Sequence, residues 1–199
     1  MTLLDKDIRE SLFEFLEREY GVVRFLEEKV TGRTRADALM VTDDSIHGIE
    51  IKSDADTYER LKKQVRYYNR YCDRCWIAAG ARHSLHVGEH VPAWWGIIIV
   101  DTENGKPDFY IRRRALPNPK PVIREKLSLL WRPELAAIQA KYGLHAYKQK
   151  SKEFVQEKIL EKIEEQDLHR EISAALFERD YTLIEKQISD YKKENGRQP

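Results

Sequence analysis

Two acidic residues in the first third of the chain have the types and the spacing to build a site for metal-assisted phosphodiester hydrolysis. Asp37 and Glu50 lie in two apolar segments, residues 36–41 and 46–51, which read as consecutive β-strands. The four turn-forming residues between these segments set Asp37 directly across from Glu50. Facing Cβ atoms in an antiparallel pair lie about 5 Å apart, so the two carboxylates are expected to converge on one face.

Lys52 adds an amine to the same face, because side chains alternate along a strand. Neighbouring carboxylates disfavour joint ionisation, and a divalent cation between them removes that repulsion. Mg²⁺, with Mn²⁺ as a substitute, fits because it takes one or two carboxylates together with water and substrate phosphate. Lys52 beside such an ion can orient or help deprotonate the attacking water and can contact the scissile phosphate. The alternative is a solvated face on which Glu50 pairs with Lys52 or Arg35.

The pattern around this hairpin predicts the elements that would position it. Their order is helix, three strands, helix, strand and a second hairpin, which favours an α/β core with helices around a mixed sheet. The second helix would open with a capping box of Asp56 and Glu59. The predicted elements are a helix over residues 1–20 ended by Gly21, strands at 22–30, 36–41 and 46–51, a helix at 57–71, a strand at 75–79, and a hairpin of 95–101 and 108–113 closed by Asn104-Gly105.

The last third of the chain is predicted to be helical. Three alternating prolines from Pro117 to Pro121 mark the boundary, because each fixes φ and restricts the residue before it. We therefore expect a core over residues 1–116 and a helical C-terminal extension over residues 117–199. The segments that lack strand signals and favour helices are 124–142, 151–165 and 168–193.

Composition excludes several classes of protein. The chain has 199 residues, 41% of them hydrophobic and 10% aromatic, too much buriable surface for a disordered chain. It has no apolar run long enough to cross a bilayer, no visible secretory signal and only two cysteines, which favours a cytoplasmic protein without membrane association. Its net charge of +1 gives no global argument for nucleic-acid binding, but residues 59–74 form a local basic ridge. A homo-oligomer is left open.

The combination of motifs resembles the PD-(D/E)XK nuclease superfamily. The segment Arg35–Val41 followed by Glu50-Ile51-Lys52 carries the metal-site part of the resemblance. Gln64-x-x-x-Tyr68 looks like the helix signature of the exonuclease-like branch. Three segments resemble a narrower group of small, poorly characterised bacterial and phage proteins assigned as nucleases: His47–Asp54, Pro92–Gly96 and Leu129–Glu134.

This resemblance implies a restriction-endonuclease-like αβββαβ core, Mg²⁺ dependence and a nucleic-acid substrate, DNA first and RNA not excluded. Asp37 and Glu50 would bind the metal with the backbone carbonyl of Ile51, and Lys52 would be the catalytic lysine. Gln64 would touch the substrate or the water shell of the metal. The function it implies is a Mg²⁺-dependent deoxyribonuclease. The alternative is a non-catalytic nucleic-acid-binding or partner-binding module on the same fold.

Two points in the resemblance stay open. Ala36 stands where the superfamily name has proline, a structural position that leaves the chemistry undecided. An upstream acid often completes such sites, and its identity decides how many metal ions bind. The candidates for it are Glu14, Glu17 and Glu28.

The second predicted helix would also meet nucleic acid. Basic side chains on it can contact phosphates, and each contact adds salt-dependent affinity. A solvated helix face is the default explanation for most of them, and Tyr68 can be a core aromatic that braces the site. The expected nucleic-acid-binding residues are Arg60, Lys63, Arg66 and Tyr68.

A zinc site is a weaker hypothesis. Cys72 and Cys75 have the spacing of half a site, and no second cysteine pair exists. His83, His86 and His90 could share one helical face, although loop or surface positions explain them more simply.

Overall fold

The computed structural model describes residues 4–27, 30–31, 34–180 and 186, and it divides into two compact units. The first unit is Met1–Val122 and the second is Ile123–Pro199. The proline-containing segment that begins at residue 117 stays with the first unit, because the N–H groups of Asn118 and Val122 donate to the carbonyls of Asp73 and Arg70. The division therefore falls after this segment, whereas the sequence placed it before.

A mixed six-stranded sheet forms the centre of the first unit, with the strand order β1-β4-β5-β6-β7-β8. The three central strands β5, β6 and β7 are parallel, and the flanking pairs are antiparallel. A separate two-stranded hairpin precedes β4. The strands are β1 (Arg24–Glu27), β2 (Val30–Thr31), β3 (Thr34–Arg35), β4 (Ala38–Val41), β5 (Ile46–Lys52), β6 (Arg74–Gly80), β7 (Gly96–Glu103) and β8 (Lys106–Arg113).

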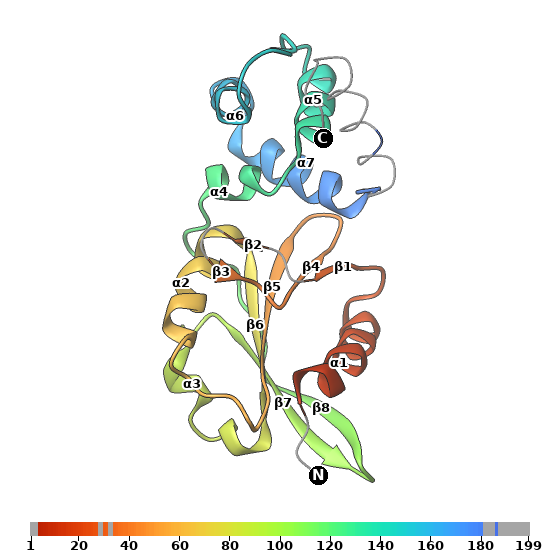
Figure 1. Ribbon diagram of the computed structural model, residues 1–199, viewed down its shortest axis with the longest axis vertical. Helices are drawn as coiled ribbons and strands as arrows, with labels where there is room; N and C mark the ends of the chain where they lie inside the picture. Colours follow the sequence, from red (N-terminus) through yellow and green to blue (C-terminus); the bar gives the residue numbers. More distant parts are fainter. Residues whose placement is uncertain (1–3, 28–29, 32–33, 181–185, 187–199) are drawn as a thin grey trace. The chain divides into compact units, whose positions relative to one another are not determined.

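Helices cover both faces of this sheet. The helix α1 (Asp5–Tyr20) and the helix α2 (Leu61–Tyr71) lie on opposite sides of it (Figure 1). Ile8, Leu12 and Leu16 bury one stripe of α1 in the core on the first face. On the other face α2 lies so close to β5 that a Cβ at Gly48 would meet the Tyr68 ring at 2.3 Å. Every residue of β5 is buried as a result, as in a strand covered on both faces.

Most predicted elements of the first unit are present. Gly21, at φ +79°, ends α1 as expected, and the Asn104-Gly105 turn between β7 and β8 has φ values of 51° and 80°. Of the predicted strand over residues 22–30, β1 joins the large sheet, Val30 belongs to β2, and residues 28 and 29 lie outside the described residues.

The start of α2 was wrongly predicted. The helix begins at Leu61, and no side chain caps its first turn. Asp56 instead accepts hydrogen bonds from the N–H and hydroxyl of Ser53, at 2.8 and 2.7 Å. This local turn competes with the capping box because a short acidic side chain serves either role.

The second unit is helical. One predicted helix, over residues 124–142, is in fact two helices: the first ends at Ser128, and the second begins after the extended residue Trp131 with Pro133 in its first turn. The predicted helix 168–193 begins earlier and ends at Phe177, and residues 181–185 and 187–193 of it lie outside the described residues. The remaining short helix, α3, is in the first unit. The helices are α3 (Val87–His90), α4 (Ile123–Ser128), α5 (Arg132–Lys141), α6 (Lys152–Leu160) and α7 (Glu165–Phe177).

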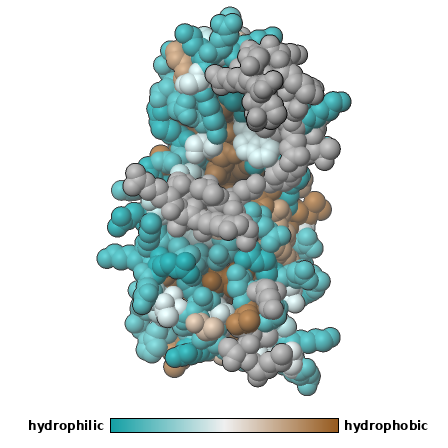
Figure 2. Space-filling model, in the orientation of Figure 1, coloured by the Kyte–Doolittle hydropathy of each residue, from teal (hydrophilic) through white to brown (hydrophobic). Residues whose placement is uncertain are grey.

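The surface agrees with the high content of charged residues. The face seen in Figure 2 is largely hydrophilic, with separate hydrophobic patches. Within the described part of the chain, no helix has the length and apolar character to cross a membrane.

Candidate active site

The observed strand register brings the two predicted carboxylates together. Ala38 pairs with Ile49 and Leu39 with Gly48, as the sequence predicts, so Asp37 directly precedes β4 opposite Glu50. The site therefore lies at the end of β5, where Lys52 is the last residue of the strand.

Glu50 and Lys52 form a buried ion pair. The Lys52 Nζ donates to the Glu50 Oε1 at 2.5 Å, and the two residues are 4% and 0% exposed. The alternative considered for this pattern expected Glu50 to pair with Lys52 on a solvated face. The pair is present, but it is buried, so the solvated face is wrong. The other carboxylate oxygen of Glu50, Oε2, is also buried and has no hydrogen-bond partner among the described residues. Such an oxygen is costly unless a cation or donor reaches it.

Asp37 is tied to the end of the strand and to α2. Its Oδ2 accepts a hydrogen bond from the Ile51 N–H at 2.8 Å. The Asp37 N–H donates to the Tyr68 hydroxyl at 3.0 Å, and that hydroxyl donates to the Ile49 carbonyl at 2.6 Å. Tyr68 is fully buried, so its predicted contact with nucleic acid is wrong. It braces the two strands that carry the carboxylates.

Gln64 lies one helical turn before Tyr68 and reaches the lysine. Its Oε1 accepts a hydrogen bond from the Lys52 Nζ at 3.3 Å. The ammonium group is therefore fixed between a carboxylate on its own strand and an amide from α2. The structure thus brings together five of the residues singled out in the sequence: Asp37, Glu50, Ile51, Lys52 and Gln64.

Burial changes the proton affinity of both acids. Desolvation and the neighbouring Asp37 raise the pKa of Glu50 to about 8, although the Lys52 ammonium opposes the change. Desolvation also raises the pKa of Asp37, against the opposing effects of the Ile51 N–H and Lys52. The unpartnered Glu50 Oε2 is an oxygen atom of the type that a hard divalent cation such as Mg²⁺ prefers.

The predicted upstream acids do not reach this site in the described structure. Glu14 and Glu17 are exposed on α1, away from the stripe that packs on the sheet, and Glu28 lies outside the described residues. No three acidic, histidine or cysteine side chains within the described ranges converge closely enough to hold one metal ion. Of the groups expected to bind a metal, the carboxylates of Asp37 and Glu50 are the two that the structure brings together at the end of β5.

Sequence reasoning missed two residues of α1 that do reach the site. The Arg9 Nη1 donates to the main-chain carbonyl of Asp37 at 2.8 Å, and its Nη2 donates to Asp5 Oδ2 at 2.8 Å. The feature of the sequence that could have revealed Asp5 and Arg9 was their i, i+4 spacing beside the buried Ile8. Because that spacing is common on solvated helices, it does not reveal a contact with a strand far along the chain.

The predicted phosphate-binding side chains differ in their direction on α2. Arg60, Lys63 and Arg66 are all exposed. At 100° per residue, Arg60 lies within about 40° of Gln64 around the helix, whereas Arg66 lies about 160° away. Arg60 is thus the basic residue that extends the site, and Arg66 faces elsewhere.

The zinc hypothesis finds no support in the described residues. His83 and His90 both pack against the ring of Tyr58, with centroids 4.8 and 3.9 Å from it. Cys72 and Cys75 are buried free thiols beneath α2.

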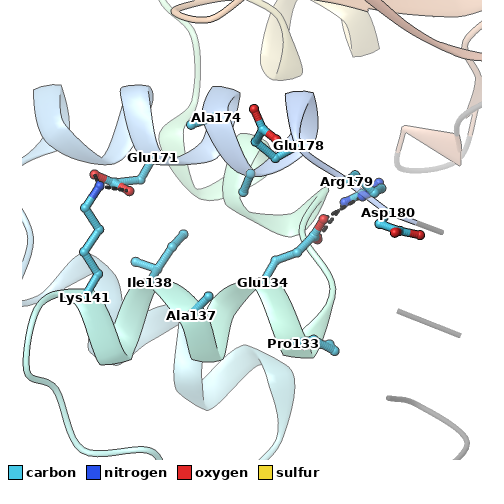
Figure 3. Close-up of a pocket in the computed structure, with 11 residues that line it drawn as sticks. Pro133, Glu134, Ala137, Ile138, Lys141, Glu171, Ala174, Glu178, Arg179 and Asp180 are labelled. Atoms are coloured by element: carbon cyan, nitrogen blue, oxygen red, sulfur yellow. Dashed lines mark hydrogen bonds and ion pairs between the residues drawn. The ribbon is translucent and has the colours of Figure 1, made fainter. Parts of the chain in front are cut away.

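A groove in the second unit is separate from all of these residues. It has a volume of about 380 Å³ and lies between α5 and α7 (Figure 3). Ala137, Ile138 and Ala174 contribute apolar lining. Two ion pairs lie along it: Lys141–Glu171 joins α5 to α7, and Glu134–Arg179 joins α5 to the segment that follows α7.

The fold and the site define a mixed α/β protein with a buried carboxylate–lysine pair at the end of a central strand. The chain belongs to the family described as bacteriophage P4 protein cII, whose model matches residues 2–195. A search of curated proteins finds no match.

Among solved structures, the chain is similar to that of Pyrococcus furiosus SfsA in complex with Ca²⁺, with 12% sequence identity and a TM-score of 0.37. The similarity covers 58% of this chain and 66% of the SfsA chain, slightly less than two thirds of its length.

Proposed function

We propose that this protein is a Mg²⁺-dependent nuclease that hydrolyses DNA phosphodiester bonds by attack of a metal-activated water. The observation that carries the proposal is the buried Glu50–Lys52 pair beside Asp37, with the Glu50 Oε2 left without a partner. The order α1, β1, β4, β5, α2, β6 supports a PD-(D/E)XK assignment with a restriction-endonuclease-like core. RNA is the alternative substrate.

Each residue has a distinct role in this proposal. Asp37, Glu50 and the Ile51 carbonyl hold the ion, which when bound supplies a Lewis acid and a more acidic water. Lys52 orients the attacking water and contacts the scissile phosphate. Gln64 fixes the Lys52 ammonium through the hydrogen bond already described.

Cleavage of DNA by purified protein tests the function. We expect cutting with Mg²⁺ or Mn²⁺, and none with a chelator. Asp37→Ala, Glu50→Gln and Lys52→Ala should each abolish cutting, while Glu14→Gln, an exposed acid on α1, should leave it unchanged. Circular dichroism checks that every variant is folded. Equal cutting by wild type and all three site variants would reveal a contaminant and refute the proposal.

A non-catalytic nucleic-acid-binding or partner-binding module is the second candidate. The observation in its favour is the exposed basic face of α2, because phosphate contacts need no metal ion. Its signature would be DNA binding without turnover, with an affinity that neither Mn²⁺ nor the Glu50→Gln substitution changes.

A further inference from the structure

Arg9 lies among three acidic side chains next to the candidate metal site. Its Nη2 is 2.8 Å from Asp5 Oδ2, and its Nη1 is 3.4 Å from Glu27 Oε2 and 2.8 Å from the Asp37 carbonyl oxygen. Only 16% of the Arg9 side chain is exposed. Helix α1, strand β1 and the residue that precedes β4 thus all meet at one guanidinium.

Two carboxylate oxygens close to Asp37 are buried without a partner among the described residues. One is Glu50 Oε2, on a residue that is fully buried, and the other is Asp5 Oδ1. Asp5 and Glu50 each interact electrostatically with Asp37. Asp5, Asp37, Glu50 and Glu27 together supply four carboxylates at this centre. The cations among them are two, Arg9 and Lys52.

Four carboxylates and two cations leave a charge of −2 when all are ionised, which one divalent ion neutralises. We propose that Arg9 is a built-in second cation of this site, so that the centre binds one divalent ion and not two. Arg9 positions Asp37 through its main-chain carbonyl and occupies, between Asp5 and Asp37, the place where a second ion would otherwise be needed. This inference rests on the metal site of the proposed function.

A purely structural role for Arg9 is the competing explanation. An i, i+4 pair with Asp5 also supports a helix, and the carbonyl contact also docks α1 on β4. That role predicts a change in stability alone. The built-in cation predicts a change in how many ions bind.

Calorimetric titration of the full chain with Mn²⁺, without DNA, separates the two roles. We expect one ion per chain for the wild type and for Arg9→Lys, and two ions for Arg9→Met, which keeps the apolar stem and removes the charge. Arg18→Met is the matched control, because Arg18 is an exposed residue of the same helix and its loss changes the net charge equally. It should bind one ion.

Asp5→Asn keeps the inference testable if Arg9→Met does not fold. We expect one ion in this variant, bound about tenfold more weakly, as for the loss of a residue that supports a ligand. Two ions in the wild type, one ion in a folded Arg9→Met, or an unchanged Mn²⁺ affinity in Asp5→Asn would overturn the inference. A single bound ion without DNA cleavage would refute only the proposed function, and no Mn²⁺ binding at all would refute both.

Discussion

Glu50 is the residue at which burial and charge act against each other most strongly. A carboxyl with a pKa of about 8 is mostly protonated at pH 7, yet it must be ionised to bind a cation. The Lys52 ammonium opposes the rise in this pKa, but desolvation by burial and the neighbouring Asp37 outweigh it. Metal binding and proton release should therefore be coupled at this residue.

This coupling predicts the pH dependence of Mn²⁺ binding. Because the pKa of Glu50 is raised, the ion must displace a proton below pH 8, so affinity should rise about tenfold per pH unit from pH 6 to 8 and level off above. Calorimetry at pH 7 in buffers of different ionisation enthalpy should detect release of about one proton. Affinity that is independent of pH over this range would contradict the prediction. Glu14→Gln provides the control.

At the scale of single residues, the sequence predicted the partners but not their environment. The pairing of Asp37 with Glu50 follows from the strand register, which the apolar pattern and the turn specify locally. The burial of Glu50 and Lys52 depends on α2 and could not be read from their own strand. Asp5 and Arg9 were missed for the same reason, since their contact with Asp37 joins segments far apart in sequence.

At the scale of elements, the close approach of α2 to β5 sets the geometry of the site. Gly48 permits it, because a Cβ there would lie 2.3 Å from the Tyr68 ring and 2.9 Å from the Cys72 sulfur. Tyr68 in turn holds the main chain of Asp37 and Ile49. The contact is therefore both a packing contact and a support for the two carboxylates.

Substitution of this glycine tests the contact. Gly48→Ala should lower the free energy of unfolding by about 1–3 kcal/mol, as expected for overpacking, and should weaken Mn²⁺ binding because Tyr68 must shift. Gly88→Ala is the matched control, since its Cβ would meet nothing closer than 3.6 Å. Urea denaturation and Mn²⁺ titration measure both effects. Equal stability of the two variants would show that α2 is not held tightly against β5.

Helix α2 also predicts which basic residue meets the substrate. Arg60→Ala should weaken DNA binding and reduce the salt slope by about one, because Arg60 lies on the Gln64 side of the helix. Arg66→Ala should change neither quantity appreciably, since Arg66 points about 160° away from Gln64. Fluorescence anisotropy at several salt concentrations, on the Glu50→Gln background to prevent cutting, measures both. Equal losses would mean that the whole exposed face contacts DNA.

Elements with strong local signals were predicted best. The Asn104-Gly105 hairpin and the end of α1 at Gly21 depend on residues that adopt positive φ, and both are present. The predicted start of α2 was wrong because Asp56 stabilises a turn with Ser53 and does not cap the helix. The prediction of one continuous helix over residues 124–142 was wrong because the helical pattern of its side chains persists across the break, whereas a new helix begins at Arg132 with Pro133 in its first turn.

At the scale of the whole molecule, the residues of the candidate site and the C-terminal helices belong to different units of the chain. All residues of the candidate site belong to residues 1–122, and the ion pairs Lys141–Glu171 and Glu134–Arg179 belong to residues 123–199.

The buried pair Glu134–Arg179 predicts how the second unit responds to substitution. The side chains are 8% and 2% exposed, and the Arg179 guanidinium also donates to the Leu129 carbonyl at 2.9 Å and lies 4.7 Å from the centre of the Trp131 ring. Arg179→Met leaves a buried carboxylate without its partner, so it should destabilise this unit by about 3–5 kcal/mol.

The double variant Arg179→Met/Glu134→Leu separates loss of the pair from loss of packing. It should recover most of that stability, because no unpaired charge remains buried. Urea denaturation followed by tryptophan fluorescence measures both, with Trp131 as the reporter beside the pair. Mn²⁺ binding should be unchanged in both variants, since no ligand of the proposed site lies in this unit. A double variant as unstable as Arg179→Met would mean that the arginine acts through its contacts with Trp131 and Leu129, and not through its charge.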